Sequence, residues 1–204
     1  MTPWDVFFRT SMKILTDVGG TVIDVGGGLR ISAERSNVLD KRRIYLKEWL
    51  KTCEYKVIDP VDTYHPDIVG DIHALPFQNE SVDSFICLAV LEHVERPVKG
   101  VEEMYRCLKK GGYVFAYMPF LFSYHAERGY YKDFWRFTRD CMDELFNDFV
   151  HIEVCEVRGP LETISHLLPG ASGKMLRYPM RFIDWMLKKQ HTKQTSGFYV
   201  LAQK

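Results

Sequence analysis

The sequence has no closely spaced cysteine pair. Its five cysteines lie far apart, at positions 53, 87, 107, 141 and 155. A zinc knuckle or a redox dithiol requires two cysteines separated by two residues, so neither is indicated. We expect reduced cysteines that behave as small apolar side chains, and we expect no metal site.

Charge of one sign and long apolar runs are lacking as well. The 27 basic and 27 acidic residues balance, so no net positive field attracts nucleic acid, and we expect none as a partner. No apolar stretch approaches the roughly 18 residues of a membrane span. Charged residues at positions 5, 9, 13 and 17 interrupt the apolar N-terminus and exclude a signal-peptide core. We therefore expect a cytoplasmic protein.

What the sequence does contain is an alternation of apolar runs and helical stretches. Its 204 residues are 46% apolar, which is enough for one α/β domain with a full core. Apolar runs predict strands at residues 21–25, 55–59, 67–70, 82–88, 113–118, 150–154 and 198–202. Helical spacing predicts helices at residues 41–51, 97–110 and 138–147, and Gly111 is expected to end the second of them. This order predicts a parallel sheet with crossover helices.

Ligands of such a sheet bind beyond the carboxyl ends of the strands, so the residues that follow each strand are the candidates. Asp24, Gly26 and Gly28 belong to the first strand and its turn, Asp59 ends the second strand, and Asp71 follows the third. Glycines let a ligand approach the backbone, and a carboxylate can accept both hydroxyl hydrogens of a ribose. Taken singly, the glycines could form an ordinary turn and Asp71 could cap one.

A nicotinamide dinucleotide site uses the same kind of sheet and is an alternative. Its sequence fingerprint has a glycine or alanine at the position where this chain has Ile31. The fingerprint also has its ribose-binding acid about 20 residues after the glycines, whereas Asp59 lies further along the chain. Such a site also gives no reason for Asp71. An NAD site, and with it an NAD-dependent oxidoreductase, is therefore the weaker interpretation of these residues.

Three segments, residues 24–28 (DVGGG), 70–94 and 108–119, resemble class I S-adenosylmethionine-dependent methyltransferases of the type-11-like group. The resemblance implies a Rossmann-like, seven-stranded, mostly parallel α/β sheet with helices on both faces and an antiparallel last strand. It also implies S-adenosylmethionine as the cofactor. It assigns the methionine end of the cofactor to Asp24, Gly26, Gly27 and Gly28, the ribose to Asp59, and the adenine to Asp71 and Ile72. It also implies that Cys87 and Leu88 supply backbone near the amino-acid moiety.

We expect a single methyltransferase domain, residues 1–204, because no repeat or Pro-, Gly- or Ser-rich linker divides the chain. Within it we expect an N-terminal cap segment at residues 1–20, a loop over the acceptor site at residues 119–138, and a helical insertion at residues 160–195.

One residue departs from the family pattern. Arg30 stands where a typical turn has its third glycine, and the long segment 29–40 then precedes the next helix. We hypothesise that Arg30 pairs with the cofactor carboxylate. The same departure supports an alternative function, in which the domain keeps the fold but acts as a non-catalytic binding module through a partner.

Residues 119–138 (PFLFSYHAERGYYKDFWRFT) carry the candidate catalytic side chains. They resemble a subgroup of methyltransferases associated with cell-surface polysaccharide biosynthesis, which implies His125 as the base, Arg136 as a substrate or loop anchor, and a small-molecule or glycan-type hydroxyl as the acceptor. Asp133 is a further candidate, and His93 is a rival base because it follows the fourth strand. Alternatively, the rings simply cover the core and Asp133 forms a surface pair with Arg136.

Residues 174–189 mix apolar and aromatic side chains with five cations: Lys174, Arg177, Arg181, Lys188 and Lys189. A basic amphipathic stretch of this kind can make weak contact with an anionic membrane surface. More often such a stretch packs on its own sheet and leaves its charges in solvent. We prefer the packing interpretation.

Overall fold

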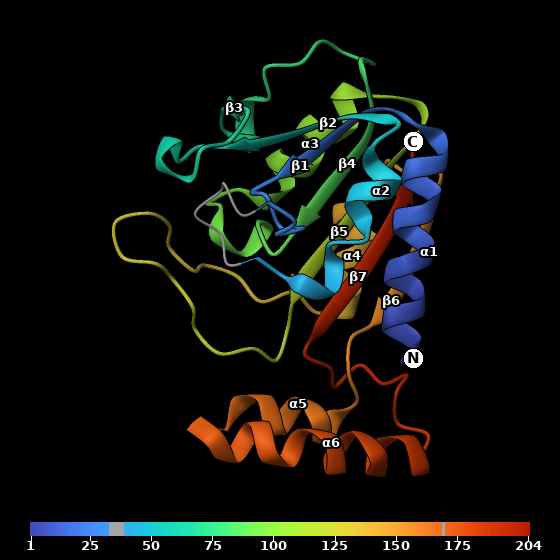
Figure 1. The fold of residues 1–204 in the computed structure, drawn as a ribbon, viewed down its shortest axis with the longest axis vertical. Helices are drawn as coiled ribbons and strands as arrows, with labels where there is room; N and C mark the ends of the chain where they lie inside the picture. Colours follow the sequence, from blue (N-terminus) through green and yellow to red (C-terminus); the bar gives the residue numbers. More distant parts are fainter. Residues whose placement is uncertain (33–38, 169) are drawn as a thin grey trace.

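The computed structural model describes residues 1–32, 39–168 and 170–204. A seven-stranded sheet in the order β3-β2-β1-β4-β5-β7-β6 forms its centre (Figure 1). The strands are β1 Gly20–Val25, β2 Cys53–Asp59, β3 Ile68–Val69, β4 Val82–Leu88, β5 Leu108–Pro119, β6 His151–Glu156 and β7 Gly197–Gln203. The helices are α1 Pro3–Val18, α2 Leu46–Leu50, α3 Pro97–Cys107, α4 Arg139–Leu145, α5 Pro160–Leu167 and α6 Gly170–Met186.

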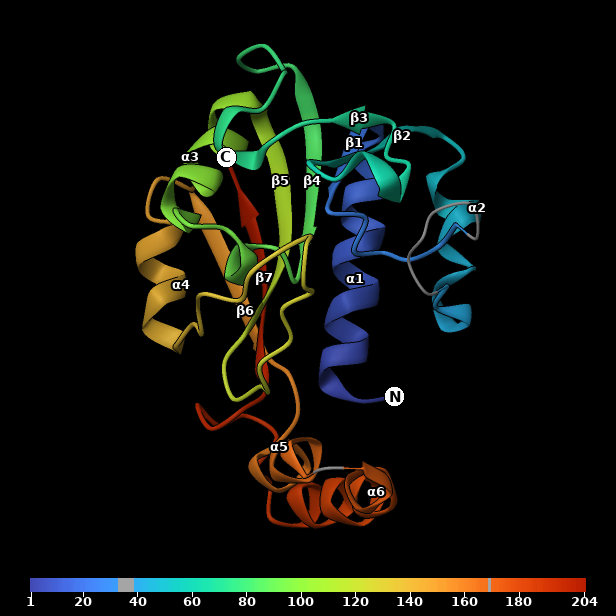
Figure 2. The ribbon, with the colours of Figure 1, turned by 90° about the vertical axis from the view of Figure 1, so that its left-hand side faces the viewer.

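The sheet is doubly wound, as the sequence predicts. Strands β3, β2, β1, β4 and β5 are parallel, whereas β7 runs antiparallel to both β5 and β6. Helices α1 and α2 cover one face and α3 and α4 the other, which Figure 2 shows edge-on. The expected Rossmann-like architecture with an antiparallel last strand is therefore confirmed.

Successive side chains of each strand point to opposite faces of the sheet, and they form a hydrophobic core on each face. In β4, Phe85 and Cys87 face the core beneath α3 and α4, whereas Ile86 and Leu88 face the core beneath α1 and α2. Because successive side chains of a strand point to opposite faces, a strand buried on both sides reads as a continuous apolar run. Helix α1, in the expected cap segment 1–20, buries Phe8, Met12 and Leu15 on the second face.

The predicted end of the helix at residues 97–110 is wrong. We expected Gly111 to end it, but α3 ends at Cys107, and Leu108 is already extended. Gly111 has φ +79° within β5, next to a register shift against β4. Lys109, also in β5, donates to the Asp83 carboxylate of β4 at 2.8 and 2.9 Å. The glycine therefore serves an irregularity in the strand rather than a helix stop.

The preferred packing of residues 174–189 is also wrong. Helix α6 packs against α5, and the two lie beyond the ends of the strands rather than on a face of the sheet (Figures 1 and 2). Only Gly173 and Asp184 of α6 are buried. In the described part of the chain, no helix is both long and apolar enough to cross a membrane. Of the long segment 29–40, residues 33–38 lie outside the described residues.

Candidate active site

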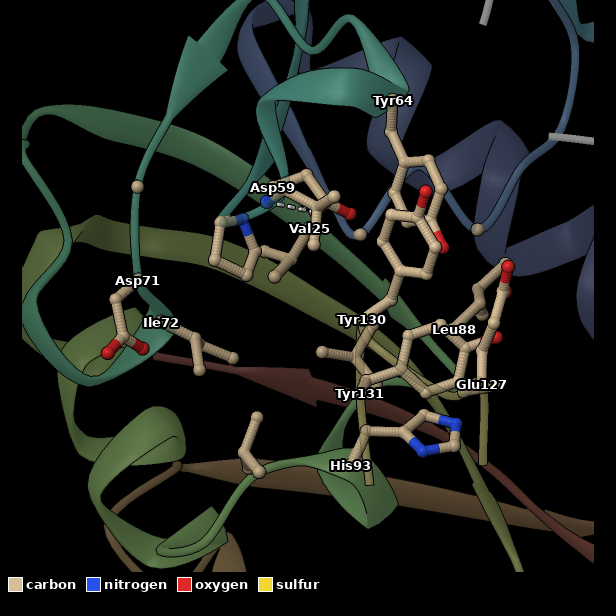
Figure 3. A pocket seen from close by; sticks show the side chains of 18 of the residues that line it. Val25, Asp59, Tyr64, Asp71, Ile72, Leu88, His93, Glu127, Tyr130 and Tyr131 are labelled. Carbon is tan, nitrogen blue, oxygen red and sulfur yellow. Dashed lines mark hydrogen bonds between the residues drawn. The ribbon is translucent and has the colours of Figure 1, made fainter. Parts of the chain in front are cut away.

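The carboxyl ends of β1, β2, β3 and β4 surround one cavity of about 420 Å³ (Figure 3). The strand order reverses between β1 and β4, and this is the point at which open α/β sheets bind their ligands. The volume lies in the range of small-molecule and cofactor sites. Of the residues predicted from the sequence, nine line it: Gly26, Gly28, Arg30, Asp59, Asp71, Ile72, Leu88, His93 and His125.

The glycine turn after β1 packs tightly against the end of β4. A Cβ at Gly26 would lie 2.7 Å from Val90 Cγ2, and one at Gly28 would lie 2.6 Å from the carbonyl oxygen of Leu88. Gly26 also has φ +71°, in the left-handed region that favours glycine. The turn thus lies flat against β4, with its backbone on the cavity wall.

Arg30, which stands in place of the third glycine, retains the backbone conformation of the turn. Its φ of +54° is left-handed, the conformation that a glycine would adopt at little cost. Its amide donates to the carbonyl of Gly27 at 3.1 Å, and its carbonyl accepts from the amide of Asp40 at 2.9 Å. The departure from the family pattern therefore leaves the backbone of the turn intact and places Arg30 on the cavity wall.

Asp24 was expected to contact the ligand but does not line the cavity. Its buried carboxylate accepts from the amides of Gly28 at 3.1 Å and Leu29 at 3.2 Å, and from the Tyr55 hydroxyl at 2.7 Å. Burial raises the pKa of Asp24 to about 6, against the opposing effect of these hydrogen bonds. Asp24 therefore acts on the site indirectly, by fixing the turn that carries Gly28.

Two other predicted residues also lie away from the cavity wall. Gly27 has φ +61° in the middle of the turn but does not line the cavity. Cys87 is fully buried in the core beneath α3 and α4, and burial raises the pKa of its thiol. Leu88, one residue further along β4, lines the cavity instead.

Asp59 ends β2 with its carboxylate at the cavity wall. One carboxylate oxygen accepts from the amide of Val61 at 2.8 Å. Among the described residues, no donor is bonded to the other oxygen, and burial raises the pKa of this carboxyl group. Asp59 thus keeps acceptor capacity for a ligand that brings hydroxyl donors.

Asp71 is at once a turn cap and a lining residue. Its carboxylate accepts from the amide of His73 at 2.9 Å and lies 2.7 Å from His73 Nδ1, and its side chain is 60% exposed. The capping role that the sequence left open is therefore present, and Asp71 stands at the rim of the cavity. The neighbouring Ile72 is buried and points into the cavity (Figure 3).

The loop after β5 closes the opposite side of the cavity. Its Glu127, Tyr130 and Tyr131 line the cavity together with His125. The ring of Tyr130 stacks on Tyr64, which follows β2, with centroids 5.2 Å apart and planes at 20°. No sequence motif predicts a site role for Tyr64, Glu127, Tyr130 or Tyr131, because nothing local shows that residues 64 and 130 meet.

His93 and His125 meet over a buried carboxylate that the sequence analysis also missed. Glu92 is fully buried, and neither of its oxygens has a hydrogen-bond partner among the described residues. His125 Nε2 lies 3.5 Å and His93 Nε2 3.8 Å from Glu92 Oε1. Each ring is oriented through Nδ1, which lies 3.0 Å from the Ser123 carbonyl in His125 and 2.7 Å from the Lys132 carbonyl in His93.

Each of these three residues offers one potential ligand atom, and the atoms lie within 4.8 Å of one another. The same contacts place the Glu92 carboxylate beside Nε2 of His125, an arrangement that favours the protonated ring. Glu92 is the main cause that raises the pKa of His125, and burial opposes it. Glu92 therefore stabilises the protonated form of His125.

Asp133 and Arg136 do not line the cavity, nor are they a surface pair. Arg136 binds Asp133 through two bonds of 2.6 and 2.7 Å, and the Asp133 side chain is fully buried. Arg136 lowers the pKa of Asp133 to about 2. Asp133 also accepts from the amide of His125 at 2.8 Å, and Arg136 donates to the carbonyls of Phe122 and Ser123. The pair fixes the loop that carries His125.

Comparison with known proteins gives a family match in the centre of the chain. Residues 45–116 match the family model described as "Methyltransferase domain". The chain is also similar to 2-methyl-6-phytyl-1,4-hydroquinone methyltransferase from Arabidopsis thaliana, at 28% identity over 128 residues that cover 56% of this chain. The matched part spans only 34% of that relative.

Solved structures share the whole fold at low sequence identity. A methyltransferase chain from the complex with the Haloferax volcanii Trm112 activator has a TM-score of 0.58 and 18% identity, over 96% of this chain and 88% of that one. An S-adenosylmethionine-dependent methyltransferase from Mesorhizobium loti has a TM-score of 0.58 and 13% identity, over 97% of both chains. One from Archaeoglobus fulgidus has a TM-score of 0.57 and 12% identity, over 100% of both. These likenesses establish the fold.

Proposed function

We propose that this chain, which has the methyltransferase fold and a methyltransferase-domain match over residues 45–116, transfers a methyl group from S-adenosylmethionine to a hydroxyl of a small molecule or glycan. The observation that carries the proposal is the cavity at the reversal point of the sheet. There a glycine turn faces the Asp59 carboxylate, one oxygen of which accepts no hydrogen bond from the described residues. When bound, the cofactor supplies a methyl group on a positively charged sulfur.

The residues present fit this cofactor. Asp59 accepts hydrogen bonds from ribose hydroxyls with the oxygen that Val61 does not use. Ile72 offers an apolar surface to the adenine, with the Asp71 carboxylate at the rim. The backbone at Gly26 and Gly28 leaves room for the methionine end, and Arg30 provides a cation for its carboxylate.

His125 is the proposed base. Its Nδ1 hydrogen is donated to the Ser123 carbonyl, so Nε2 holds the lone pair that takes the proton of the acceptor hydroxyl. Glu92, 3.5 Å from Nε2, stabilises the imidazolium that forms. Asp133 and Arg136 act as positioning residues because they hold the loop and do not reach the cavity. His93 stays the rival base, since its Nε2 faces the same carboxylate.

A glycan-type hydroxyl remains the proposed acceptor, in line with the polysaccharide-associated subgroup that residues 119–138 resemble. The tyrosine rings of this loop support the proposal, because the apolar faces of sugars pack on aromatic rings. A small hydroxylated acceptor agrees with the hydroquinone named for the Arabidopsis relative. The alternative of a non-catalytic binding module rested on Arg30 in place of a glycine. Because Arg30 adopts the left-handed conformation and the turn is preserved, this substitution gives that alternative little support.

Calorimetric titration with S-adenosylhomocysteine tests the cofactor site. We expect Asp59→Asn to weaken binding at least about tenfold, because the amide keeps the shape but loses the charge and one acceptor. Asp62→Asn is the matched control, since Asp62 follows on the same turn but does not line the cavity. Absence of heat with the wild type, or equal affinity in both variants, would contradict the proposed site.

A further inference from the structure

Helices α5 and α6 form a hairpin that its own buried charges hold together. We call residues 160–168 and 170–189 the α5–α6 hairpin. Asp184 of α6 is buried and accepts from the amides of Leu161 and Glu162 at the start of α5, at 3.2 and 2.8 Å. Glu162 is buried in turn and binds Arg181 at 2.6 Å and Arg177 at 3.2 Å. The two acidic side chains of the hairpin are therefore turned inward.

The outward surface of α6 is apolar. Four exposed large side chains follow one another at intervals of three and four residues, which places them on one stripe of the helix: Met175 is 75% exposed, Tyr178 69%, Phe182 57% and Trp185 62%. Met186, four residues after Phe182, widens the stripe and is 62% exposed. Leu187 beyond its end is 58% exposed. An apolar stripe of this size on the outside of a folded protein marks an interaction surface.

The same hairpin carries only one sign of exposed charge. Its two acids, Glu162 and Asp184, are buried, whereas Lys174, Lys188 and Lys189 are exposed. In the described part of the chain, none of these three lysines forms an ion pair with an acid of the hairpin. A second copy of this surface would bring like charges together. The partner is therefore anionic and also accepts apolar side chains.

We infer that the α5–α6 hairpin docks on the surface of a lipid bilayer that contains anionic headgroups. Such a surface provides both components: phosphate charges for the lysines and an acyl boundary for the Phe182, Trp185 and Met186 side chains. The hairpin lies in the interface, since no described helix is long and apolar enough to cross. Docking does not depend on the proposed methyl transfer.

The hairpin lies next to the loop that covers the cavity. The ring of His166 in α5 stacks on Phe122 of the loop, with centroids 6.4 Å apart. Tyr124 of the loop is 76% exposed, and β5 ends at Pro119, on the side of the sheet from which the hairpin extends (Figure 1). Docking through the hairpin therefore brings the loop close to the lipid surface, where a lipid-linked acceptor would be presented.

Flotation of the full chain with vesicles tests the inference. We expect binding to vesicles of phosphatidylcholine and phosphatidylglycerol, loss of binding at high salt, and weak binding to pure phosphatidylcholine. Replacement of Lys174, Lys188 and Lys189 by alanine should weaken binding on the order of 100-fold, at about fivefold for each cation. Replacement of Lys41, Lys47 and Lys110, which are exposed on other elements, is the matched control.

The apolar stripe is tested separately. The double variant Phe182→Ser with Trp185→Ser should abolish binding to the vesicles. Val150→Ser is the control and should not change binding, because Val150, just before β6, is 86% exposed but lies outside the hairpin. Anionic vesicles should shift tryptophan emission to the blue in the wild type, and Trp185→Phe should remove most of that shift. No flotation of the wild type, equal binding to neutral vesicles, or equal loss in the control variants would overturn the inference. Circular dichroism establishes that each variant is folded.

Discussion

At the scale of single residues, burial and neighbours give chemically identical side chains different roles. Asp24 and Asp59 both lie near the carboxyl ends of parallel strands, where a ligand-binding acid is expected. Asp24 is surrounded by donors from its own turn, whereas Asp59 keeps one oxygen for the cavity. Glu92 differs from both, because it is buried, faces two histidines and has no hydrogen-bond partner among the residues that the structure describes. These differences lead to two predictions.

The first concerns the pH dependence of methyl transfer. A base must be unprotonated, so activity falls as the pH drops through its pKa. Because Glu92 raises the pKa of His125, the acid limb of kcat/KM should lie above the ordinary histidine value of about 6.5. Glu92→Gln removes the charge and should move this limb to lower pH, and His125→Ala should reduce turnover about 100-fold or more. An unmoved limb in Glu92→Gln would exclude this role of Glu92.

The second concerns Asp24 and stability. Its folded-state pKa is raised from 3.8 to about 6, so the stability that it contributes is complete below pH 3.8 and is lost as the pH rises through about 6. Asparagine does not titrate. The free energy of unfolding of the wild type should therefore fall relative to Asp24→Asn by about 1 kcal/mol between pH 5 and pH 7. Urea unfolding at the two pH values measures the difference, and a constant difference would contradict the raised pKa.

At the scale of elements, the turn after β1 and the loop after β5 are fixed to the sheet in different ways. At Gly28 the turn has no space for a side chain, since a Cβ there would lie 2.6 Å from the backbone of β4. The loop is held by a buried ion pair between Asp133 and Arg136. A substitution in the turn should therefore act through a clash, and one in the loop through an unpaired charge.

Gly28→Ala should separate the turn from β4. We expect the affinity for S-adenosylhomocysteine to fall at least about tenfold, measured by calorimetry, because the carbonyl of Leu88 cannot move without disturbing the sheet. Gly19→Ala is the control, since it adds backbone strain at φ +70° but meets no atom within 4 Å. An equal loss of affinity in both variants would mean that the clash with Leu88 is not what weakens binding.

Arg136→Ala should leave the buried Asp133 carboxylate without its partner. The expected loss is about 3 kcal/mol of unfolding free energy, much of it the cost of the unpaired charge. If so, the double variant Asp133→Asn with Arg136→Ala should recover part of the stability that the single variant loses. Urea unfolding of both variants gives the comparison, and a double variant less stable than Arg136→Ala would contradict the explanation.

At the scale of the whole molecule, the choice of cofactor can be tested by unfolding. A ligand at 100 times its dissociation constant stabilises the native state by about 2.7 kcal/mol. At roughly 2–4 °C per kcal/mol for a domain of this size, this raises Tm by roughly 5–10 °C. We expect this shift with S-adenosylhomocysteine and none with NAD at the same concentration. The reverse result would favour the oxidoreductase interpretation that the sequence left open.

The order of the elements and the end of the sheet that carries the site could be predicted from the sequence. Apolar runs and helical periodicity are local signals, and they gave β4 at residues 82–88 without error. The rule that ligands bind at the carboxyl ends of parallel strands then led to Asp59, Asp71 and His93, which line the cavity, although their roles stay predictions. Here the sequence was sufficient, because the topology of a parallel sheet leaves few alternatives.

Only the tertiary structure decided which way the side chains face and what surrounds them. Asp24 turns to its own backbone, Glu92 is buried beneath two histidines, and Tyr64 meets Tyr130 from a distant segment. The apolar stripe of α6 points to solvent because the buried Glu162 and Asp184 turn the polar side of the hairpin inward. Periodicity shows that a helix has an apolar side, but long-range contacts decide whether that side meets the sheet or remains free.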